Sequence, residues 1–302
     1  MVKKMLAVLL AMLMLCVFMP MMASADGVDI TADFTDENFR AAVYEKIGKT
    51  APVPIYDTDV AAIASLGVNG KDIKSLAGLE HFAGLKELFC GSNQLTSLPA
   101  LPSGLERLGC SYNQLSSLPA LPSSLEVLSC GDNPLNVLPA LPSLINLSCH
   151  NNKLTVLPAL PSSLKTLQCS GNQLISLPAL PVSLEILVCD SNQLASLPAL
   201  PSSLRELWCG YNQLTTIDVT GLPLEKLQCY LNNMTDPSDV IGFTGTWSDD
   251  WRADPFVFAP QNSTTTPEPE PDPGDEPTEP SFFAKLWSFI LKWFLFGWIW
   301  MK

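Results

Sequence analysis

Cysteine is the residue type with the most reactive chemistry in this chain. Nine cysteines are present, and eight recur at intervals of 19 or 20 residues, namely Cys90, Cys110, Cys130, Cys149, Cys169, Cys189, Cys209 and Cys229. Cysteine thiolates can form disulfides, bind zinc or act as nucleophiles. A zinc site needs ligands that converge on one point, whereas equivalent positions of a repeat lie in a line. We expect free thiols packed as small hydrophobic groups, with scattered disulfides and metal binding as the alternatives.

The remaining candidates for catalysis form no recognisable arrangement. Asp190 follows Cys189 directly, but this cysteine belongs to the regular set and no histidine occurs in its repeat. His81 and His150 have no pattern of partners around them. The sequence contains no nucleophile elbow, phosphate-binding loop or metal motif. We expect no enzymatic activity, no metal and no cofactor.

The elements that carry the cysteines belong to a repeat of 20 residues. Its first copy reads Leu85-x-x-Leu88-x-Cys90-x-x-Asn93-x-Leu95-x-x-Leu98-Pro99-x-Leu101-Pro102. Eight copies of this frame follow one another, and one is a residue short at 142–144. A degenerate copy of 22 residues begins at Ile63. Such a period predicts a solenoid, because stacked turns bury a face that one turn cannot bury alone.

Each repeat contains two kinds of backbone. Leucines at positions 1 and 4 and the cysteine at position 6 alternate with polar residues, which predicts a short strand with one buried face. The asparagine at position 9 can donate and accept hydrogen bonds, so it can satisfy main-chain groups where the chain leaves the strand. The two prolines favour an extended, polyproline-like return path over a helix. We expect no helix between residues 95 and 215.

These residues resemble the leucine-rich-repeat consensus, with cysteine at the third apolar position of each strand. The Leu-Pro-x-Leu-Pro ending is similar to the shortest class of such repeats, known from secreted bacterial effectors. The segment Phe34–Leu79 resembles the N-terminal region of internalin-like surface proteins of Gram-positive bacteria. The resemblance covers about residues 30–235. It implies a leucine-rich-repeat solenoid and binding to proteins, but no particular ligand.

The aromatic residues of the strand segments are candidates for ligand binding. In a leucine-rich-repeat solenoid, positions 3, 5, 7 and 8 of each repeat are expected on the concave side. Exposed aromatic side chains on a rigid surface are typical interface anchors, although single exposed ones also occur without a function. Two groups meet the criterion, namely Trp208, Tyr211 and Tyr230 near the C-terminal end and Phe89 and Tyr112 near the other.

The segments outside the repeats complete the domain organisation. Basic residues, an apolar run and the small residues 23–25 predict an N-terminal signal peptide for export. We divide the chain into a signal peptide (1–25), a helical N-terminal cap (26–62), the solenoid (63–235), a C-terminal cap (236–259), an acidic proline-rich linker (260–280) and a hydrophobic helix (281–302).

An open solenoid needs a cover at each end. At the N-terminal end, Thr35 is placed to cap a helix that begins at Asp36, with Phe34 and Phe39 as a hydrophobic staple and Gly48 at the helix end. At the C-terminal end, aromatic and aliphatic residues are expected to cover the last turn, or alternatively to form a ligand site, namely Ile241, Trp247, Trp251, Phe256 and Phe258.

The tail and the charge of the chain limit its partners. Phe282–Met301 is apolar, and as a helix it would reach about 30 Å, enough to span a bilayer core or to lie in its interface. The net charge of −13 argues against nucleic acid as a partner.

The sequence therefore predicts an exported, membrane-associated surface protein that binds a protein or peptide. The alternatives are a structural or glycan-binding role in the envelope and an effector delivered into host cells, which the signal peptide disfavours.

Overall fold

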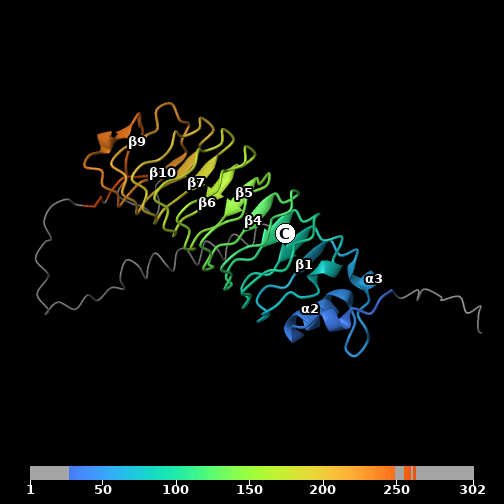
Figure 1. The fold of residues 1–302 in the computed structure, drawn as a ribbon. Coiled ribbons are helices and arrows are strands. Elements are labelled where there is room, and N and C mark those ends of the chain that lie inside the picture. Colours follow the sequence, from blue (N-terminus) through green and yellow to red (C-terminus); the bar gives the residue numbers. More distant parts are fainter. Residues whose placement is uncertain (1–26, 249–254, 260, 263–302) are drawn as a thin grey trace, which may run out of the picture. The chain divides into compact units, whose positions relative to one another are not determined.

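The computed structural model describes residues 27–248, 255–259 and 261–262, and these form one unit of stacked turns (Figure 1). The predicted signal peptide, most of the predicted linker and the predicted hydrophobic tail lie outside the described residues, as does Trp251. Among the described residues, no helix is long and apolar enough to cross a bilayer.

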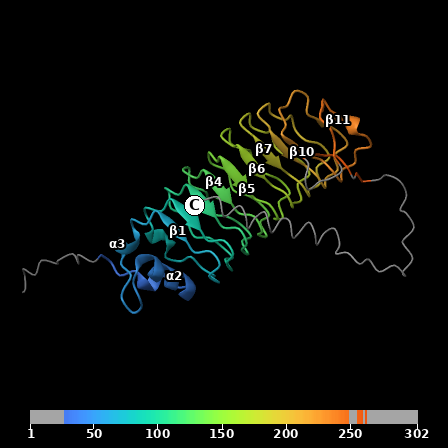
Figure 2. The same ribbon diagram turned by 180° about the vertical axis from the view of Figure 1, so that it is seen from behind.

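A parallel sheet of ten short strands runs along the solenoid in the order β1-β2-β3-β4-β5-β6-β7-β8-β10-β12 (Figures 1 and 2). Each strand pairs with the strand of the next turn so that equivalent positions of the repeat are in register. The bounds are β1 Ser65–Gly67, β2 Glu87–Phe89, β3 Arg107–Gly109, β4 Val127–Ser129, β5 Asn146–Ser148, β6 Thr166–Gln168, β7 Ile186–Val188, β8 Glu206–Trp208, β10 Lys226–Gln228 and β12 Phe256–Val257. The leucine-rich-repeat solenoid expected from the sequence is thus confirmed.

The core is a set of columns of identical residues. The leucines at position 1 from Leu85 to Leu204, at position 4 from Leu88 to Leu227 and at position 11 from Leu95 to Leu214 are at most 1% exposed, as are the eight cysteines at position 6, whereas Leu224 is only partly buried. Because each turn covers the apolar side chains of the previous one, the same residue type is buried at every level of the stack.

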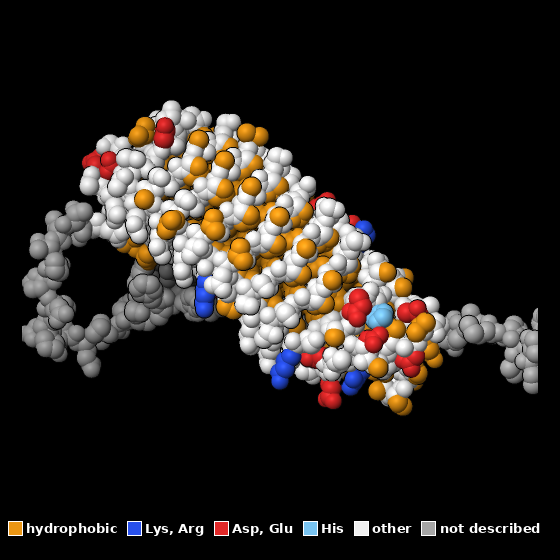
Figure 3. All heavy atoms as spheres, in the orientation of Figure 1, with side chains coloured by type: hydrophobic (Ala, Val, Ile, Leu, Met, Phe, Trp, Pro, Cys, Tyr) orange, Lys and Arg blue, Asp and Glu red, His pale blue; other side chains and the backbone are white. Residues whose placement is uncertain are grey.

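The return segments, defined as positions 11 to 20 of each repeat, have the predicted extended backbone. Residues 95–215 contain no helix, as expected from the two prolines in each copy. The six return segments between residues 95 and 203 also contain no charged residue. Hydrophobic side chains accordingly form rows across the stacked turns on this side of the molecule (Figure 3).

The asparagine at position 9 connects neighbouring turns, as the sequence predicted. The amide nitrogen of Asn152 donates to the carbonyl oxygens of Cys130, Cys149 and His150 at 3.0–3.1 Å. Its carbonyl oxygen accepts from the backbone N–H of Leu135 in the preceding turn. Equivalent bonds recur from Asn93 to Asn232, so these groups remain satisfied although they are buried.

The residue at position 8 has a left-handed backbone in every repeat. Its φ lies between 50° and 57° in seven copies, which include Tyr112, Tyr211 and Leu231, and glycine occupies the position in the eighth. Left-handed φ is uncommon for bulky residues, so the surrounding stack must impose it. The conformation turns the chain out of the strand towards the return path.

The N-terminal cap differs in one detail from the prediction. Helix α2 (Glu37–Ile47) begins one residue later than expected, and Asp36, not Thr35, is its N-cap. One carboxylate oxygen of Asp36 accepts from Phe39 N, and the other accepts from the backbone N–H groups of Lys74 and Ser75. Asp36 is the N-cap because one of its carboxylate oxygens can accept from the helix while the other accepts from the first turn. The aromatic contact between residues 34 and 39, the left-handed Gly48 at the helix end and the short helix α3 (Asp57–Val60) complete this cap.

At the C-terminal end the return path changes. Strand β9 (Ile217–Asp218) pairs with β11 (Val240–Ile241), and β12 adds one more strand to the end of the main sheet. The ring of Trp247 lies 4.1 Å from that of Phe243 and 5.5 Å from that of Phe258, measured between centroids. Phe258 is buried, but Ile241 is 49% exposed and does not cover the core as expected. Three 3-10 turns complete the described elements, at Thr31–Asp33, Leu79–His81 and Pro237–Asp239.

Candidate functional site

The candidate site lies on the strand face, defined as the surface formed by positions 3, 5, 7 and 8 of the repeats. In the main sheet, the middle residue of each strand from β2 to β8 and of β10 is buried, and in most of these strands both of its neighbours are partly exposed. The backbone of this face is fixed by the hydrogen bonds of the sheet and by the asparagines beneath its edge. Side chains on the face are therefore presented by a rigid support.

The cysteines lie beneath this face and cannot take part in its chemistry. All eight are buried and free. Burial raises the pKa of Cys90, Cys149 and Cys229 to about 12 and that of the other five well above the ordinary value. Thiols that stay protonated are poor nucleophiles, so the column acts as part of the core. The described residues contain no group of three potential metal ligands.

Trp208 lies at the end of β8 and is partly exposed. The ammonium group of Lys226, on β10, lies 5.8 Å from the centroid of the tryptophan ring, within the range of a cation–π contact. The indole N–H makes a long hydrogen bond of 3.4 Å to the carboxylate of Glu206. The same carboxylate lies 3.6 Å from Lys226. Charged groups of two neighbouring strands thus hold the ring on the strand face.

Tyr211 and Tyr230 lie edge to face, with their ring centroids 5.4 Å apart. Tyr211 is partly exposed, but Tyr230 is only 8% exposed, and the expectation that its ring is open to solvent is wrong. The reason is Gly210, the equivalent residue one turn earlier. A Cβ atom at Gly210 would lie 3.1 Å from the ring of Tyr230, so the absence of a side chain there leaves room for the ring to pack against the strand face.

Asp190 lies one further turn along the same column and was not recognised as part of the site. Its carboxylate accepts a hydrogen bond of 2.8 Å from Gly210 N. Burial raises its pKa to about 7, against the lowering effect of the hydrogen bond from Gly210 N. Burial also raises the pKa of Tyr211 and Tyr230, and the negative charge of Asp190 adds to this effect. The structure therefore brings two of the predicted residues, Tyr211 and Tyr230, together with Asp190, which was not predicted.

Phe89 and Tyr112, the other predicted group, do not form a pair like that of the two tyrosines. Phe89 is partly exposed, and its ring covers Gly109 of the next turn, where a Cβ atom would lie 3.0 Å from it. Tyr112 is 40% exposed. Burial raises its pKa, as do the charge of Asp132 and a hydrogen bond to it. The role of all five predicted residues in binding stays a prediction.

His150 has partners that the sequence pattern did not reveal. Its ring nitrogens lie 2.9 Å from the Ser148 hydroxyl and 2.9 Å from the Asp132 carboxylate. His81 likewise lies 2.8 Å from Asp33. The sequence pattern did not reveal these contacts, because the partners are contributed by other turns or lie two residues away on the same face.

The serine, histidine and aspartate of this chain of contacts resemble a hydrolytic triad in composition only. Acyl transfer also needs backbone N–H groups free to bind the developing oxyanion. The N–H groups of Cys149 and Asn151, which follow Ser148, donate to carbonyl oxygens of the next turn. His150 is itself only 8% exposed. The contacts therefore link turns and give no support to acyl transfer.

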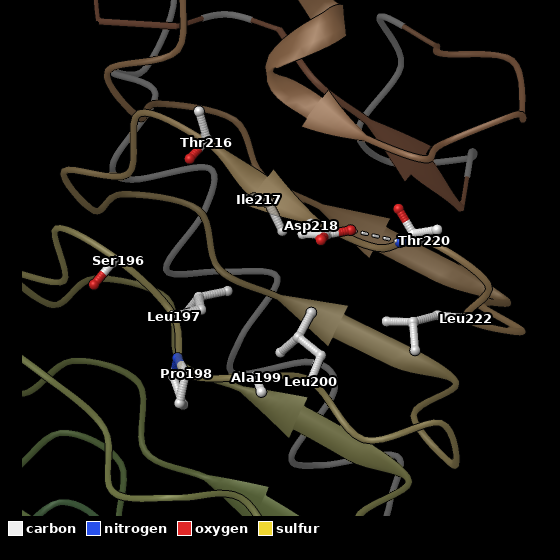
Figure 4. A pocket seen from close by; sticks show the side chains of 10 residues that line it. All are labelled: Ser196, Leu197, Pro198, Ala199, Leu200, Thr216, Ile217, Asp218, Thr220 and Leu222. Atoms are coloured by element: carbon white, nitrogen blue, oxygen red, sulfur yellow. Dashed lines mark hydrogen bonds between the residues drawn. The ribbon is translucent and has the colours of Figure 1, made fainter.

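A hollow of about 350 Å³ lies on the other side of the solenoid, where the return path changes (Figure 4). It is lined by Leu197, Leu200, Ile217 and Leu222, among others, and by Asp218, whose carboxylate accepts from Thr220 N. The hollow contains none of the predicted aromatic residues. It is lined by residues of the return segments, whereas the strand face is formed by positions 3, 5, 7 and 8. The hollow and the strand face are therefore separate surfaces.

Comparison with known proteins supports the fold and the repeat type. No family model and no curated protein matches the chain. Among solved structures, YopM from Yersinia enterocolitica WA-314 is 40% identical over 56% of this chain, with a TM-score of 0.55. The functional domain of InlJ from Listeria monocytogenes, described as including a cysteine ladder, is 29% identical over 70% of this chain, also with a TM-score of 0.55. This chain is a leucine-rich-repeat solenoid similar to these bacterial proteins.

The match spans only 38% of the YopM chain and 54% of the InlJ chain. The likeness of this leucine-rich-repeat protein to both supports a scaffold for protein interaction. The residues that sequence reasoning missed on its strand face are Asp132, His150 and Asp190. The sequence does contain a signal for the packing of His150 and of Tyr230. In each case the equivalent residue one turn earlier is a glycine, Gly131 or Gly210, over which the ring can lie.

Proposed function

We propose that this protein binds a protein or peptide ligand on the strand face, without catalysis. The observation that carries the proposal is the pair of partly exposed aromatic residues Trp208 and Tyr211 on one turn of a rigid face. Aromatic side chains dominate the energetics of many interfaces, because they bury a large area with little loss of side-chain freedom. A face that is already rigid also loses little entropy on binding.

The surroundings of Trp208 favour an interface centre over an isolated surface residue. The ring is held by Lys226 and Glu206 rather than left free, and Tyr211 follows three residues later on the same turn. Phe89 and Tyr112 would supply a second contact region, nearer the N-terminal end of the same face. A ligand that follows the sheet could therefore contact both groups.

We further propose that the protein is exported and presented at the cell surface, with membrane association through Phe282–Met301. The support is in the sequence, namely the signal-like residues 1–25 and the apolar C-terminal segment. A linker with six acidic residues between 267 and 280 would separate the solenoid from the membrane. A glycan ligand is the alternative to a protein, since tyrosine and tryptophan rings also serve as platforms for sugars.

The test is capture of ligands by the immobilised full-length chain from envelope and host-surface fractions, together with binding to a glycan array. We expect Trp208→Ala to weaken binding of the captured protein by about 2 kcal/mol, roughly 30-fold, with little change in melting temperature. Ile175→Ala serves as the control, because Ile175 is 66% exposed on a return segment. A sharp fall in melting temperature with unchanged affinity per folded molecule would contradict the proposal, and binding to sugars alone would favour the glycan alternative.

A further inference from the structure

The carboxylate of Asp190 is exceptional among the acidic groups of the strand face. Glu87 and Glu206, at position 3, each lie 3.6 Å from a basic group of the next turn, Arg107 and Lys226 respectively. Asp132 is partnered by His150. Of the ion pairs formed by the described residues, none includes Asp190.

The surroundings of Asp190 make an unneutralised charge costly. The Asp190 side chain is partly buried and close enough to Tyr211 and Tyr230 to raise their pKa, and the hydrogen bond that its carboxylate accepts comes from a neutral group, Gly210 N. A desolvated carboxylate without a cation is destabilised relative to its protonated form. The raised pKa of Asp190 is the expected consequence.

We propose that Asp190, Tyr211 and Tyr230 form a subsite for one basic side chain, best an arginine, of the protein partner. The inference rests on the proposed function, since the cation would belong to the ligand on the strand face. A guanidinium group can pair with a carboxylate through two hydrogen bonds and can stack on a tyrosine ring. It would supply the charge that the chain itself provides to the other acids of this face.

Gly210 gives the subsite its form. It lies between Asp190 and Tyr230 in the column of position 7, and a Cβ atom there would lie 3.1 Å from the tyrosine ring and 3.2 Å from the carboxylate. The missing side chain therefore brings the acid and the aromatic ring together from turns on either side. If the only role of the Asp190 carboxylate were to accept from Gly210 N, it would need neither tyrosine ring. Asparagine would then serve equally well.

Between pH 5.5 and 8, binding to this subsite depends on the ionisation of Asp190. The other titratable groups that face Asp190 are Tyr211, Tyr230 and the thiols of Cys169, Cys189 and Cys209, and all have a raised pKa, so they stay neutral in this range. With a pKa of about 7, the ionised fraction of Asp190 falls ~30-fold between pH 8 and pH 5.5. Affinity for a cationic ligand falls by the same factor.

The test uses the full-length chain and two probes, N-acetyl-arginine methylamide and the citrulline analogue, which has nearly the same shape but no charge. The readout is the amide NMR signal of Gly210, whose N–H donates to Asp190. At pH 8 the arginine probe shifts this signal in a saturable way, whereas the citrulline probe binds at least 10-fold more weakly. At pH 5.5 the arginine probe loses most of its affinity.

Asp190→Asn abolishes the difference between the two probes, and Asp218→Asn, an equal change of charge on a return segment, leaves it intact. Equal binding of both probes by the native chain, or an affinity that does not change with pH, overturns the subsite without any variant. If capture of a partner requires Trp208 but is the same for Asp190→Asn, the proposed function stands and this inference is wrong. If the arginine probe binds but no partner depends on Trp208, the proposed function fails and the subsite remains.

Discussion

The asparagine at position 9 shows how one side chain holds two turns together. Each amide group donates to carbonyl oxygens of its own turn and of the previous one. It also accepts from a backbone N–H of the previous turn that lies outside the strands. Because these main-chain groups are buried, removal of the amide leaves them without partners. An unsatisfied buried group costs about 1–3 kcal/mol.

We expect Asn152→Ala to lower the free energy of unfolding by about 2–4 kcal/mol, because both its donated and its accepted bonds are lost. Chemical denaturation followed by circular dichroism measures the effect. Asn136→Ala makes the same chemical change at an exposed position of the preceding turn and should stay within about 0.5 kcal/mol of the native chain. Similar losses for the two variants would contradict the role given to position 9.

The thiols provide a second prediction at the scale of residues. With burial raising the pKa to about 12 at Cys90 and Cys149, the reactive thiolate is scarce and inaccessible in the native chain. Titration with a thiol reagent should find few reactive groups in the native protein and all eight repeat cysteines after unfolding without reductant. Ser116→Cys, at an exposed position of a return segment, should add one group that reacts at once. Fewer than eight reactive repeat thiols after unfolding would indicate disulfides.

At the scale of elements, helix α2 and the first turn share one capping residue. Asp36→Ala should lower the free energy of unfolding by about 1–2 kcal/mol or more, because the helix cap and the bonds to Lys74 N and Ser75 N are lost together. Asp36→Asn should recover much of the loss, since asparagine is also a good N-cap. Thr35→Ala should have little effect. Thermal unfolding of the three variants distinguishes the caps, and a larger effect for Thr35 would restore the original assignment.

At the scale of the whole molecule, the apolar tail is expected to determine where the solenoid is found. Ten leucine, isoleucine and phenylalanine residues in Phe282–Met301 each favour insertion by about 0.3–0.6 kcal/mol, whereas Lys292 near the middle costs about 2.5–3.5 kcal/mol. The balance favours the membrane. Cells that express the full chain and a version that ends at Pro280 should differ on fractionation, with only the full chain requiring detergent. Equal solubility of both would contradict membrane association.

The architecture followed from the sequence because its determinants repeat locally. The spacing of Leu85, Leu88 and Cys90 specifies a strand with one buried face, and the two prolines exclude a helix on the return path. The asparagine could be assigned its role because its amide can only satisfy groups within reach of the turn in which it occurs. Eight nearly identical copies then fix the stacking, since each turn presents the next with the same columns.

The tertiary structure decided the features that depend on pairs of turns. The burial of Tyr230 depends on a glycine 20 residues earlier, and the partner of His150 is an aspartate 18 residues away. Asp36 became the helix cap because the first turn offered it two further N–H groups. A periodic sequence predicts which positions face outward. The neighbours that stacking places beside an outward side chain decide whether it is buried, paired or exposed. These contacts between turns differ wherever the surface side chains differ.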